Sequence, residues 1–339
     1  MDAFSEVLSD LRLKGALFFS AELTAPWSFS APPSTAMAPL LLIRAPHLII
    51  YHLVVEGTMR SQLPDGSRMA LVPGDIVVFA HGHAHELGEG SAGKPLQQEA
   101  VFNKIATREL SPFHGGGGGS TTRLVCGFLA CDPLLCGRIL EGLPPMWKVN
   151  VRTDRAGHWL EQAILHLVDE ATSHNPGSDA VLAKLSEALF VDTLRRYVTA
   201  LPDQTTGWLA GARDPLVGKS LALLHSRPQH PWTIAELAET VGLSRSTLLE
   251  RFTRYLSEPP MAYLTGWRLR LAAQALASTS KGVADIAADV GYESEAAFNR
   301  AFKRALGLPP ARYRRERRTL PTTALRGASP VTVSGPQYT

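Results

Sequence analysis

Apolar side chains between residues 233 and 314 recur at helical spacing, and the pattern occurs twice. The stretch 233–242, TIAELAETVG, reappears in kind as 282–291, GVADIAADVG, at an offset of 49 residues. An internal repeat of this kind indicates two copies of one supersecondary unit. Beyond each final glycine the offset becomes 50, and it relates four pairs: Leu248 and Phe298, Phe252 and Phe302, Pro259-Pro260 and Pro309-Pro310, and Tyr263 and Tyr313.

Each copy predicts a helix, a tight turn and a second helix. In the first copy, Thr233 and Glu236 form a T-x-x-E capping box, and Gly242 can adopt the positive φ that ends a helix. Ser244 and Ser294 are placed to cap the second helices, whose apolar residues face inward at i, i+4 spacing. Their outward positions are Arg245, Ser246, Leu249 and Glu250 in the first copy and Glu295, Ala296, Asn299 and Arg300 in the second.

A helix–turn–helix with a polar outer helix is the arrangement that places side chains in the major groove of DNA. Residues 290–314, VGYESEAAFNRAFKRALGLPPARYR, closely resemble the signature of AraC-type transcription regulators. The resemblance implies a DNA-binding module in which both outer helices read bases, with Thr233, Lys303 and Arg304 as candidates for backbone contacts. Between the units, residues 260–278 predict one helix roughly 27 Å long, near the ~34 Å between successive major-groove faces.

The chain before this module has the pattern of a β domain. Short apolar runs separated by Pro, Gly and Asp predict strands from about residue 10 to about residue 130, as in small sandwiches and jelly rolls. The runs are 40–43, 47–55, 69–71, 76–79 and 123–129. Segment 72–85, VPGDIVVFAHGHAH, is similar to the second cupin motif, although Ala80 stands where that motif has proline. The predicted fold class is therefore α+β and multidomain: an N-terminal cupin-like β-sandwich or jelly roll, then an all-α tandem helix-turn-helix domain.

Four histidines, His52, His81, His83 and His85, raise the question of a metal site. The cupin metal set needs an H-x-H pair and a Glu upstream of Gly57, and those positions fall near Arg44 and Pro46 and at Ile50. None of these is a ligand, so we expect no metal and no cofactor, with a bound metal as the alternative. A small barrel can hold one organic ligand. The candidate lining of this effector pocket is His52, Val54, His83 and His85.

After Pro144-Pro145 the pattern becomes helical, with helices expected over 158–173 and 179–201 around an Asn-Pro-Gly turn. The resemblance implies that these helices form a homodimer contact, and packing back on the sandwich is the alternative. The predicted domains are a sensor (1–145), a helical hairpin (146–201), a linker (202–213), the DNA-binding module (214–320) and a flexible tail (321–339).

Charge supports this division. The net charge is +3, yet residues 214–320 hold 16 Lys and Arg against 10 Asp and Glu, a surplus of six. A basic module beside a more acidic remainder fits one DNA-facing domain. The N-terminus carries Asp2 and Glu6 before any basic residue, and no apolar run reaches the ~20 residues of a membrane helix, so we expect a cytoplasmic protein.

The three cysteines predict neither a disulfide framework nor a common zinc site. Cys126 lies in an apolar run and is expected in the core. Cys131 and Cys136 flank Asp132-Pro133, and the sequence leaves open the alternative that they are accessible and form a thiol redox switch.

Together these observations predict an AraC-type transcription regulator that is not an enzyme and that responds to a small molecule or a stress signal. The expected partners are double-stranded operator DNA, RNA polymerase, an unidentified effector and a second copy of the chain, with no membrane. Activation is the working hypothesis, although the sequence does not decide between activation and repression. The alternatives are a metal-dependent cupin enzyme fused to a DNA-binding module, and an architectural DNA binder with little sequence preference.

Overall fold

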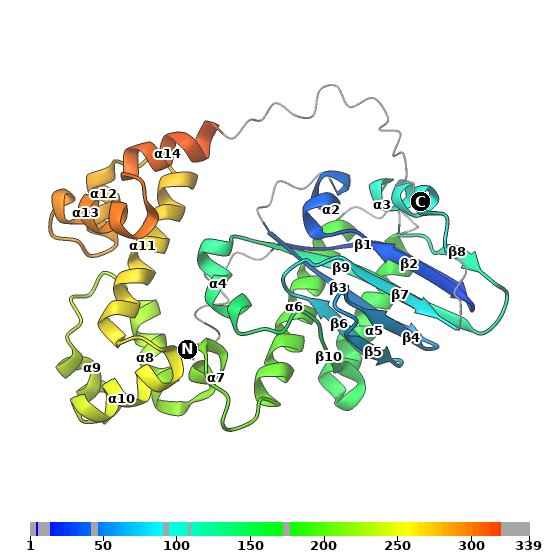
Figure 1. Cartoon of the computed structure of the whole chain (residues 1–339), viewed down its shortest axis with the longest axis horizontal. Helices are drawn as coiled ribbons and strands as arrows, with labels where there is room; N and C mark the ends of the chain where they lie inside the picture. Colours follow the sequence, from blue (N-terminus) through cyan, green and yellow to red (C-terminus); the bar gives the residue numbers. More distant parts are fainter. Residues whose placement is uncertain are drawn as a thin grey trace.

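The structure is a computed structural model with a β-sandwich on one side and a set of short helices on the other (Figure 1). The proposed tail 321–339 and the turn residues 172–176 lie outside its description. No helix in the described part of the chain is both long and apolar enough to cross a membrane. The described residues are 5, 14–41, 47–90, 95–107, 110–171 and 177–319.

Two sheets form the sandwich. The six-stranded sheet has the order β10-β6-β3-β9-β1-β8, in which only β1 and β8 pair in parallel, and the four-stranded sheet has the order β2-β7-β4-β5. The strands are β1 (Lys14–Thr24), β2 (Trp27–Ala31), β3 (His47–Glu56), β4 (Met59–Gln62), β5 (Arg68–Leu71), β6 (Asp75–Phe79), β7 (His85–Glu89), β8 (Phe113–Gly116), β9 (Thr121–Cys131) and β10 (Trp147–Asn150).

Strand β3 is apolar on both faces because both faces are covered. Successive side chains of a strand point to opposite faces, so Ile50, His52 and Val54 face the four-stranded sheet. Ile49, Tyr51 and Leu53 face the helices on the other side. The strand predicted at 47–55 is confirmed as β3, and its run of hydrophobic residues is continuous because both of its faces are buried.

Other parts of the sandwich differ from the prediction. The run 40–43 is not a described strand, because Leu40 ends helix α2 (Ser34–Leu40) and residues 42–46 lie outside the description. Helix α3 (Gln98–Thr107) and strand β10 were not predicted. Strand β10 is short and is stabilised by pairing with β6, a non-local contact that local periodicity does not reveal.

The predicted helical hairpin consists of α5 (Arg155–Ala171) and α6 (Ser178–Thr199), preceded by the 3₁₀ turn η1 (Val151–Thr153). Helix α6 packs back on the six-stranded sheet, where Ser186 Oγ lies 2.5 Å from the Tyr51 hydroxyl. Gly15 has no side chain at this contact, and a Cβ there would come within 2.9 Å of Ser186 Oγ. The hairpin thus covers the outer face of the sheet.

The remaining helices form the C-terminal part. They are α7 (Trp208–Arg213), α8 (Pro215–Ser226), α9 (Ile234–Val241), α10 (Arg245–Leu256), α11 (Pro260–Ser278), α12 (Val283–Asp289), α13 (Glu295–Leu306) and α14 (Pro310–Thr319). Helix α7 lies in the stretch expected to be a linker, and its Trp208 and Leu209 are buried.

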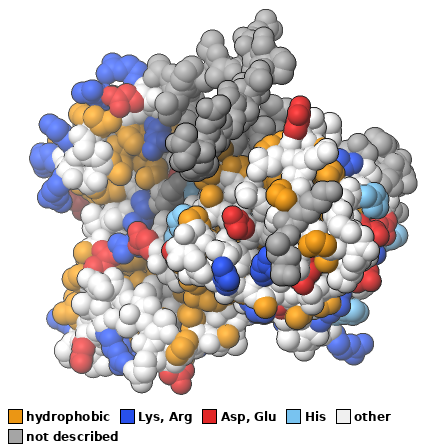
Figure 2. Space-filling view, turned by 45° about the vertical axis from the view of Figure 1, so that its right-hand side comes forward, with side chains coloured by type: hydrophobic (Ala, Val, Ile, Leu, Met, Phe, Trp, Pro, Cys, Tyr) orange, Lys and Arg blue, Asp and Glu red, His pale blue; other side chains and the backbone are white. Residues whose placement is uncertain are grey.

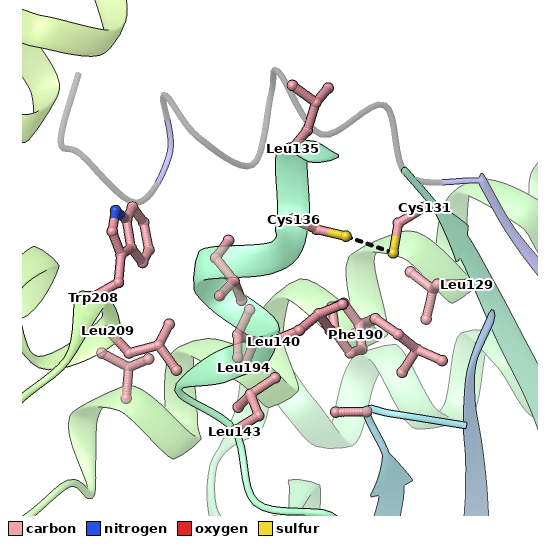
Figure 3. Close-up of a cluster of buried hydrophobic side chains, with 14 of the residues drawn as sticks. Leu129, Cys131, Leu135, Cys136, Leu140, Leu143, Phe190, Leu194, Trp208 and Leu209 are labelled. Carbon is pink, nitrogen blue, oxygen red and sulfur yellow. Dashed lines mark hydrogen bonds between the residues drawn. The ribbon is translucent and has the colours of Figure 1, made fainter. Parts of the chain in front are cut away.

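Helix α4 (Pro133–Glu141) joins the sandwich to these helices. Figure 3 shows Leu140 and Leu143 in one buried cluster with Phe190 and Leu194 of α6 and with Trp208 and Leu209 of α7. On the same helix, Arg138 forms an ion pair of 2.5 Å with Glu258, which lies between α10 and α11. The alternative that Cys131 and Cys136 are accessible is wrong. Both thiols are buried at the start of α4, where Cys136 Sγ lies 2.8 Å from Cys131 Sγ.

Helix α11 holds the two helix-turn-helix units together. Its first half contributes Trp267 to the core shared with the first unit, and its second half contributes Leu276 to the core of the second unit. Its Arg268 donates hydrogen bonds to the carbonyls of Pro228 (2.6 Å) and His230 (2.7 Å) in the first unit. Gly291, in the turn of the second unit, packs directly on Gln229.

Two equivalent glycines allow this packing to be tested. Gly242 and Gly291 end the first helix of each unit with φ of 79° and 82°, where alanine costs about 1–2 kcal/mol. A Cβ at Gly291 would lie 2.6 Å from Gln229 O, whereas a Cβ at Gly242 has no neighbour within 4 Å. We expect Gly291→Ala to lower the free energy of unfolding more than Gly242→Ala, measured by urea titration. Equal losses would show that the two units do not pack as described.

Candidate DNA-reading surface and sandwich cavity

The helix predicted to be the first reader is α10. Thr233 caps α9 by accepting a hydrogen bond from Glu236 N (3.1 Å), and Gly242 ends it in the left-handed region. The Glu236 carboxylate does not complete the capping box, because it bonds His230 Nε2 at 2.7 Å instead. Ser244 then caps α10 through Thr247 N.

The two faces of α10 separate as predicted. Leu248, Phe252 and Leu256 are buried, while Arg245, Ser246, Leu249 and Glu250 are exposed. Leu249 is 43% exposed, which is unusual for a leucine in this protein. Arg251, by contrast, forms a two-pronged ion pair with Asp214, the cap of α8, so it orients α10.

The second reader helix, α13, repeats this geometry. Ser294 caps it through Ala297 N (3.3 Å), and Phe298 and Phe302 are fully buried. Glu295, Ala296 and Arg300 are exposed and Asn299 is half-buried. Of the candidate backbone contacts, Thr233, Lys303 and Arg304 are all exposed. Figure 2 shows Lys and Arg side chains gathered over the second unit and α14.

A buried polar network fixes the first unit behind its reader helix. Trp208 Nε1–H donates to the Tyr263 hydroxyl at 2.7 Å, and that hydroxyl lies 2.7 Å from His225 Nε2. Burial lowers the pKa of His225 to about 3, so the imidazole is neutral and accepts the tyrosine proton. The network joins α7, α8 and α11, which fixes the platform that carries α10.

The sandwich encloses a cavity of about 30 Å³ between its two sheets. Its walls come from β1, β2, β3, β7 and β9, and helices α2 and α3 close it through Met37, Val101 and Ile105. The lining is almost wholly apolar. Its polar side-chain atoms belong to Trp27, His52, His85 and Cys126.

Strand register brings three of these polar groups into one chain. His52 on β3 lies opposite Cys126 on β9, and His52 Nδ1 lies 2.8 Å from Cys126 Sγ. Across the sandwich, His52 Nε2 lies 2.8 Å from His85 Nε2, and His85 Nδ1 lies 3.0 Å from the carbonyl of His83. Burial lowers the pKa of His85 to about 4 and the pKa of His52 well below its usual value, so both rings are neutral.

Neutral rings fix the direction of every bond in this chain. The His83 carbonyl can only accept, so His85 Nδ1 carries its proton and His85 Nε2 accepts from His52 Nε2–H. His52 Nδ1 is then bare and accepts the Cys126 thiol proton. The hydrogen-bonding capacity of both imidazoles is used within the protein.

The structure brings two of the four residues of the predicted effector pocket to the cavity. His52 and His85 line the cavity, but Val54 is packed in the core outside its wall, and His83 is exposed before β7 begins. His81 does not line the cavity, and its Nε2 lies 3.0 Å from the carbonyl of Leu143. Sequence reasoning missed Trp27 because β2 and β7 pair across a long sequence separation.

Among described residues, no three His, Cys, Asp or Glu side chains converge to hold a metal, so the residues do not fit the cupin metal.

Comparison with known proteins agrees with this architecture. A cupin family model matches residues 2–199, and a helix-turn-helix domain model matches residues 237–316. A putative AraC-like transcription regulator of Streptomyces lividans is 31% identical over 318 residues, which cover 93% of this chain and 98% of the relative. The chain belongs to the AraC-type transcription regulators.

Other transcription regulators are similar over most or part of the chain. The transcriptional regulator AlkR of Acinetobacter baylyi is 27% identical over 93% of this chain and 100% of its own length. RclR of Escherichia coli, an RCS-specific transcriptional activator, is 27% identical over 80% of this chain and 86% of its own. A solved AraC-type regulator from Chromobacterium violaceum covers 33% of this chain and 99% of its own, at 28% identity and a TM-score of 0.31.

The neutral histidines give this regulator a predictable pH dependence. His85 has a pKa of about 4 when folded and about 6.5 when unfolded, so below pH 6.5 the unfolded state binds more protons. Stability is therefore lost as the pH falls from 6.5 toward 4. His85→Gln should reduce this slope by up to one proton, roughly 1.4 kcal/mol per pH unit. His83→Gln is the matched control in the same urea titrations, because it also replaces a histidine but the His83 side chain is exposed and lies outside the buried chain of hydrogen bonds. An unchanged slope in His85→Gln would contradict the assignment.

Proposed function

We propose that this AraC-type regulator couples a small-molecule or stress signal in its sandwich to DNA reading by α10 and α13. The observation that carries the proposal is the continuous apolar core, which runs from the six-stranded sheet through α4, α6 and α7 into the first helix-turn-helix unit. A change in the packing of the sandwich can therefore be transmitted through this core to α7, α8 and α11, the helices that hold α10. The units are a sensor (1–145), a hairpin (146–201), a connecting stretch (202–213) and a DNA-binding module (214–320).

The base readers in this proposal are the exposed residues of the two reader helices. Arg245 can bind guanine with two hydrogen bonds, Glu250 can accept from cytosine N4, and Leu249 suits a thymine methyl group. In α13 the strongest base-reading candidates are Asn299 and Arg300, with Glu295 and Ala296 beside them. Thr233, Lys303 and Arg304 contact phosphates, which position the readers without selecting sequence.

The effector is an organic molecule held in the sandwich cavity, without a metal, a cofactor or a catalytic step. An effector must bind the DNA-competent and DNA-incompetent states unequally, because equal affinity shifts neither state. Sequencing of the DNA recovered with the purified cytoplasmic protein, with and without cell extract, tests both the operator and the response. Loss of the response on chelation, with recovery by one divalent ion, would replace this proposal with a metal sensor.

The active form is a homodimer that uses the outer face of the hairpin. Trp159 on α5 is 66% exposed and Val181 on α6 is 49% exposed, both high values for apolar side chains. Sedimentation velocity should show a dimer that Trp159→Glu converts to a monomer. The proposed mode of action is activation through RNA polymerase. The similar RclR of Escherichia coli is named a transcriptional activator.

Base reading by Arg245 can be separated from general affinity. Arg245→Ala should weaken operator binding by about 1–3 kcal/mol and relax the preference at one base pair, because the side chain is exposed on the reader helix. Selection from a randomised operator library measures this preference. Equal weakening of all sequences would assign Arg245 to phosphate instead.

Lys303 and Arg304 should behave in the opposite way. Each lies exposed in the last turn of α13, and loss of one phosphate contact lowers the salt dependence of binding by about one ion. We expect Lys303→Ala and Arg304→Ala to weaken every sequence alike and to reduce the slope of log K against log salt. A changed base preference in either variant would contradict the phosphate assignment.

A further inference from the structure

The middle of α11 is the place where the core of the first helix-turn-helix unit gives way to the core of the second. Trp267 belongs to the core that includes the first unit, and Leu269 belongs to the core of the second, with Arg268 between them. A helix of 19 residues is roughly 28 Å long, so a bend of about 10° at its middle displaces either end by ~2.5 Å. Base pairs are ~3.4 Å apart along the duplex. A slight bend of α11 would therefore move one reader helix by most of a base-pair step.

Arg268 connects the two units at this point. Its Nε and Nη2 donate to the carbonyls of Pro228 (2.6 Å) and His230 (2.7 Å), which lie in the loop before α9. Its Nη1 donates a longer hydrogen bond of 3.4 Å to the carbonyl of Gly291, in the turn that leads into α13. The loop is in turn tied to α9, since His230 Nε2 lies 2.7 Å from Glu236 Oε1. One guanidinium thus reaches from the first unit to the second.

The surroundings of Arg268 distinguish it from the exposed arginines of the reader helices. It is half-buried, and within the described part of the chain all of its hydrogen bonds go to backbone carbonyls. The turn at Gly291 packs closely on the same loop, where an added Cβ would lie 2.6 Å from Gln229 O and 3.0 Å from Arg268 Nη2. A planar guanidinium presents its donors in a rigid fork, whereas a lysine has the same charge on a flexible stem. Lysine cannot reproduce these directions.

We propose that Arg268 is a positioning residue that fixes the number of base pairs between the two half-sites of one chain. The proposal rests on the base reading by α10 and α13 given above. With the contacts of Arg268 in place, the second reader helix meets the duplex at one spacing. Without them α11 can bend, and the second reader can follow a half-site that lies one base pair nearer or farther. The preference for spacing is then lost, while the preference at each base pair remains.

The test uses the full-length protein and duplexes that the wild type selects from a randomised library. The half-sites are located first, as the base pairs at which Arg245→Ala and Arg300→Ala relax the preference. One or two base pairs are then inserted or removed between the two half-sites of one chain. Each base pair turns the second half-site by roughly 35° and moves it by ~3.4 Å. The wild type should therefore bind about tenfold more weakly for each base pair added or removed.

Two variants of Arg268 separate its geometry from its charge. Arg268→Ala should weaken the best spacing about tenfold and bind spacers one base pair shorter or longer within about threefold of it, because the contacts between the units are lost. Arg268→Lys should show the same flattened profile, since it keeps the charge and loses the fork. Neither variant should change the slope of log K against log salt, because no phosphate contact is removed.

Arg270→Ala is the matched control. It removes an arginine from the same helix, and the guanidinium of Arg270 lies over the rings of Trp267 (5.6 Å) and Tyr263 (6.0 Å) in the first unit. Any affinity that this variant loses through reduced stability should be lost equally for all spacers. Gly291→Ala keeps Arg268 but forces the turn away from Gln229, so it should also flatten the profile. This variant decides the question even if Arg268→Ala does not fold.

Contrary results are distinct for the proposal and for the function on which it rests. A sharp optimum in both Arg268 variants, a flattened profile in Arg270→Ala, or a wild type that binds all spacers alike refutes the positioning role. Wild-type behaviour of Arg268→Lys with a reduced salt slope in Arg268→Ala would assign Arg268 to a phosphate contact instead. None of these results affects base reading. Base reading itself is refuted if no base pair depends on Arg245 or Arg300, which is known before any spacer is changed.

Discussion

The structure depends on one apolar core that continues from the six-stranded sheet into the first helix-turn-helix unit. Leu129 on β9, Leu140 on α4 and Leu194 on α6 belong to the same cluster as Trp208 on α7 and Leu224 on α8. The second unit has a separate core, which meets the rest mainly through α11 and Leu134. The sandwich and the first unit are therefore stabilised by the same apolar core. The second unit is held in position mainly by α11.

The DNA-reading half was predictable because its information is local. The cap, the glycine turn and the i, i+4 apolar stripe all lie within about 25 residues, and each of them occurs in both copies of the repeat. The exposed residues Arg245 and Leu249 and the buried Phe252 accordingly have the predicted environments. The bounds of α11, Pro260 to Ser278, were also correct, because prolines start it and Ser-Thr-Ser follows its apolar stripe.

The cavity was less predictable because strands distant in sequence form it. Alternation along β3 indicated that His52 and Val54 share a face. Only the pairing of the strands decides which of the two side chains lines the cavity. The Trp27 side chain joins it through the pairing of β2 with β7, and Cys126 through the pairing of β9 with β3. Cys131 and Cys136 looked accessible beside Asp132-Pro133, yet the packing of α4 against α6 and α7 buries both.

The contact of Arg268 and Gly291 with the loop at 228–230 has a consequence for promoter architecture. In the proposed mode of DNA reading, one chain distinguishes the two directions along a duplex, because the two units are joined in one fixed order and their exposed residues differ. The part of the operator that one chain of the proposed dimer contacts is therefore asymmetric. Inverting that site at a promoter would keep every base contact and turn the sandwich to face the opposite way along the DNA.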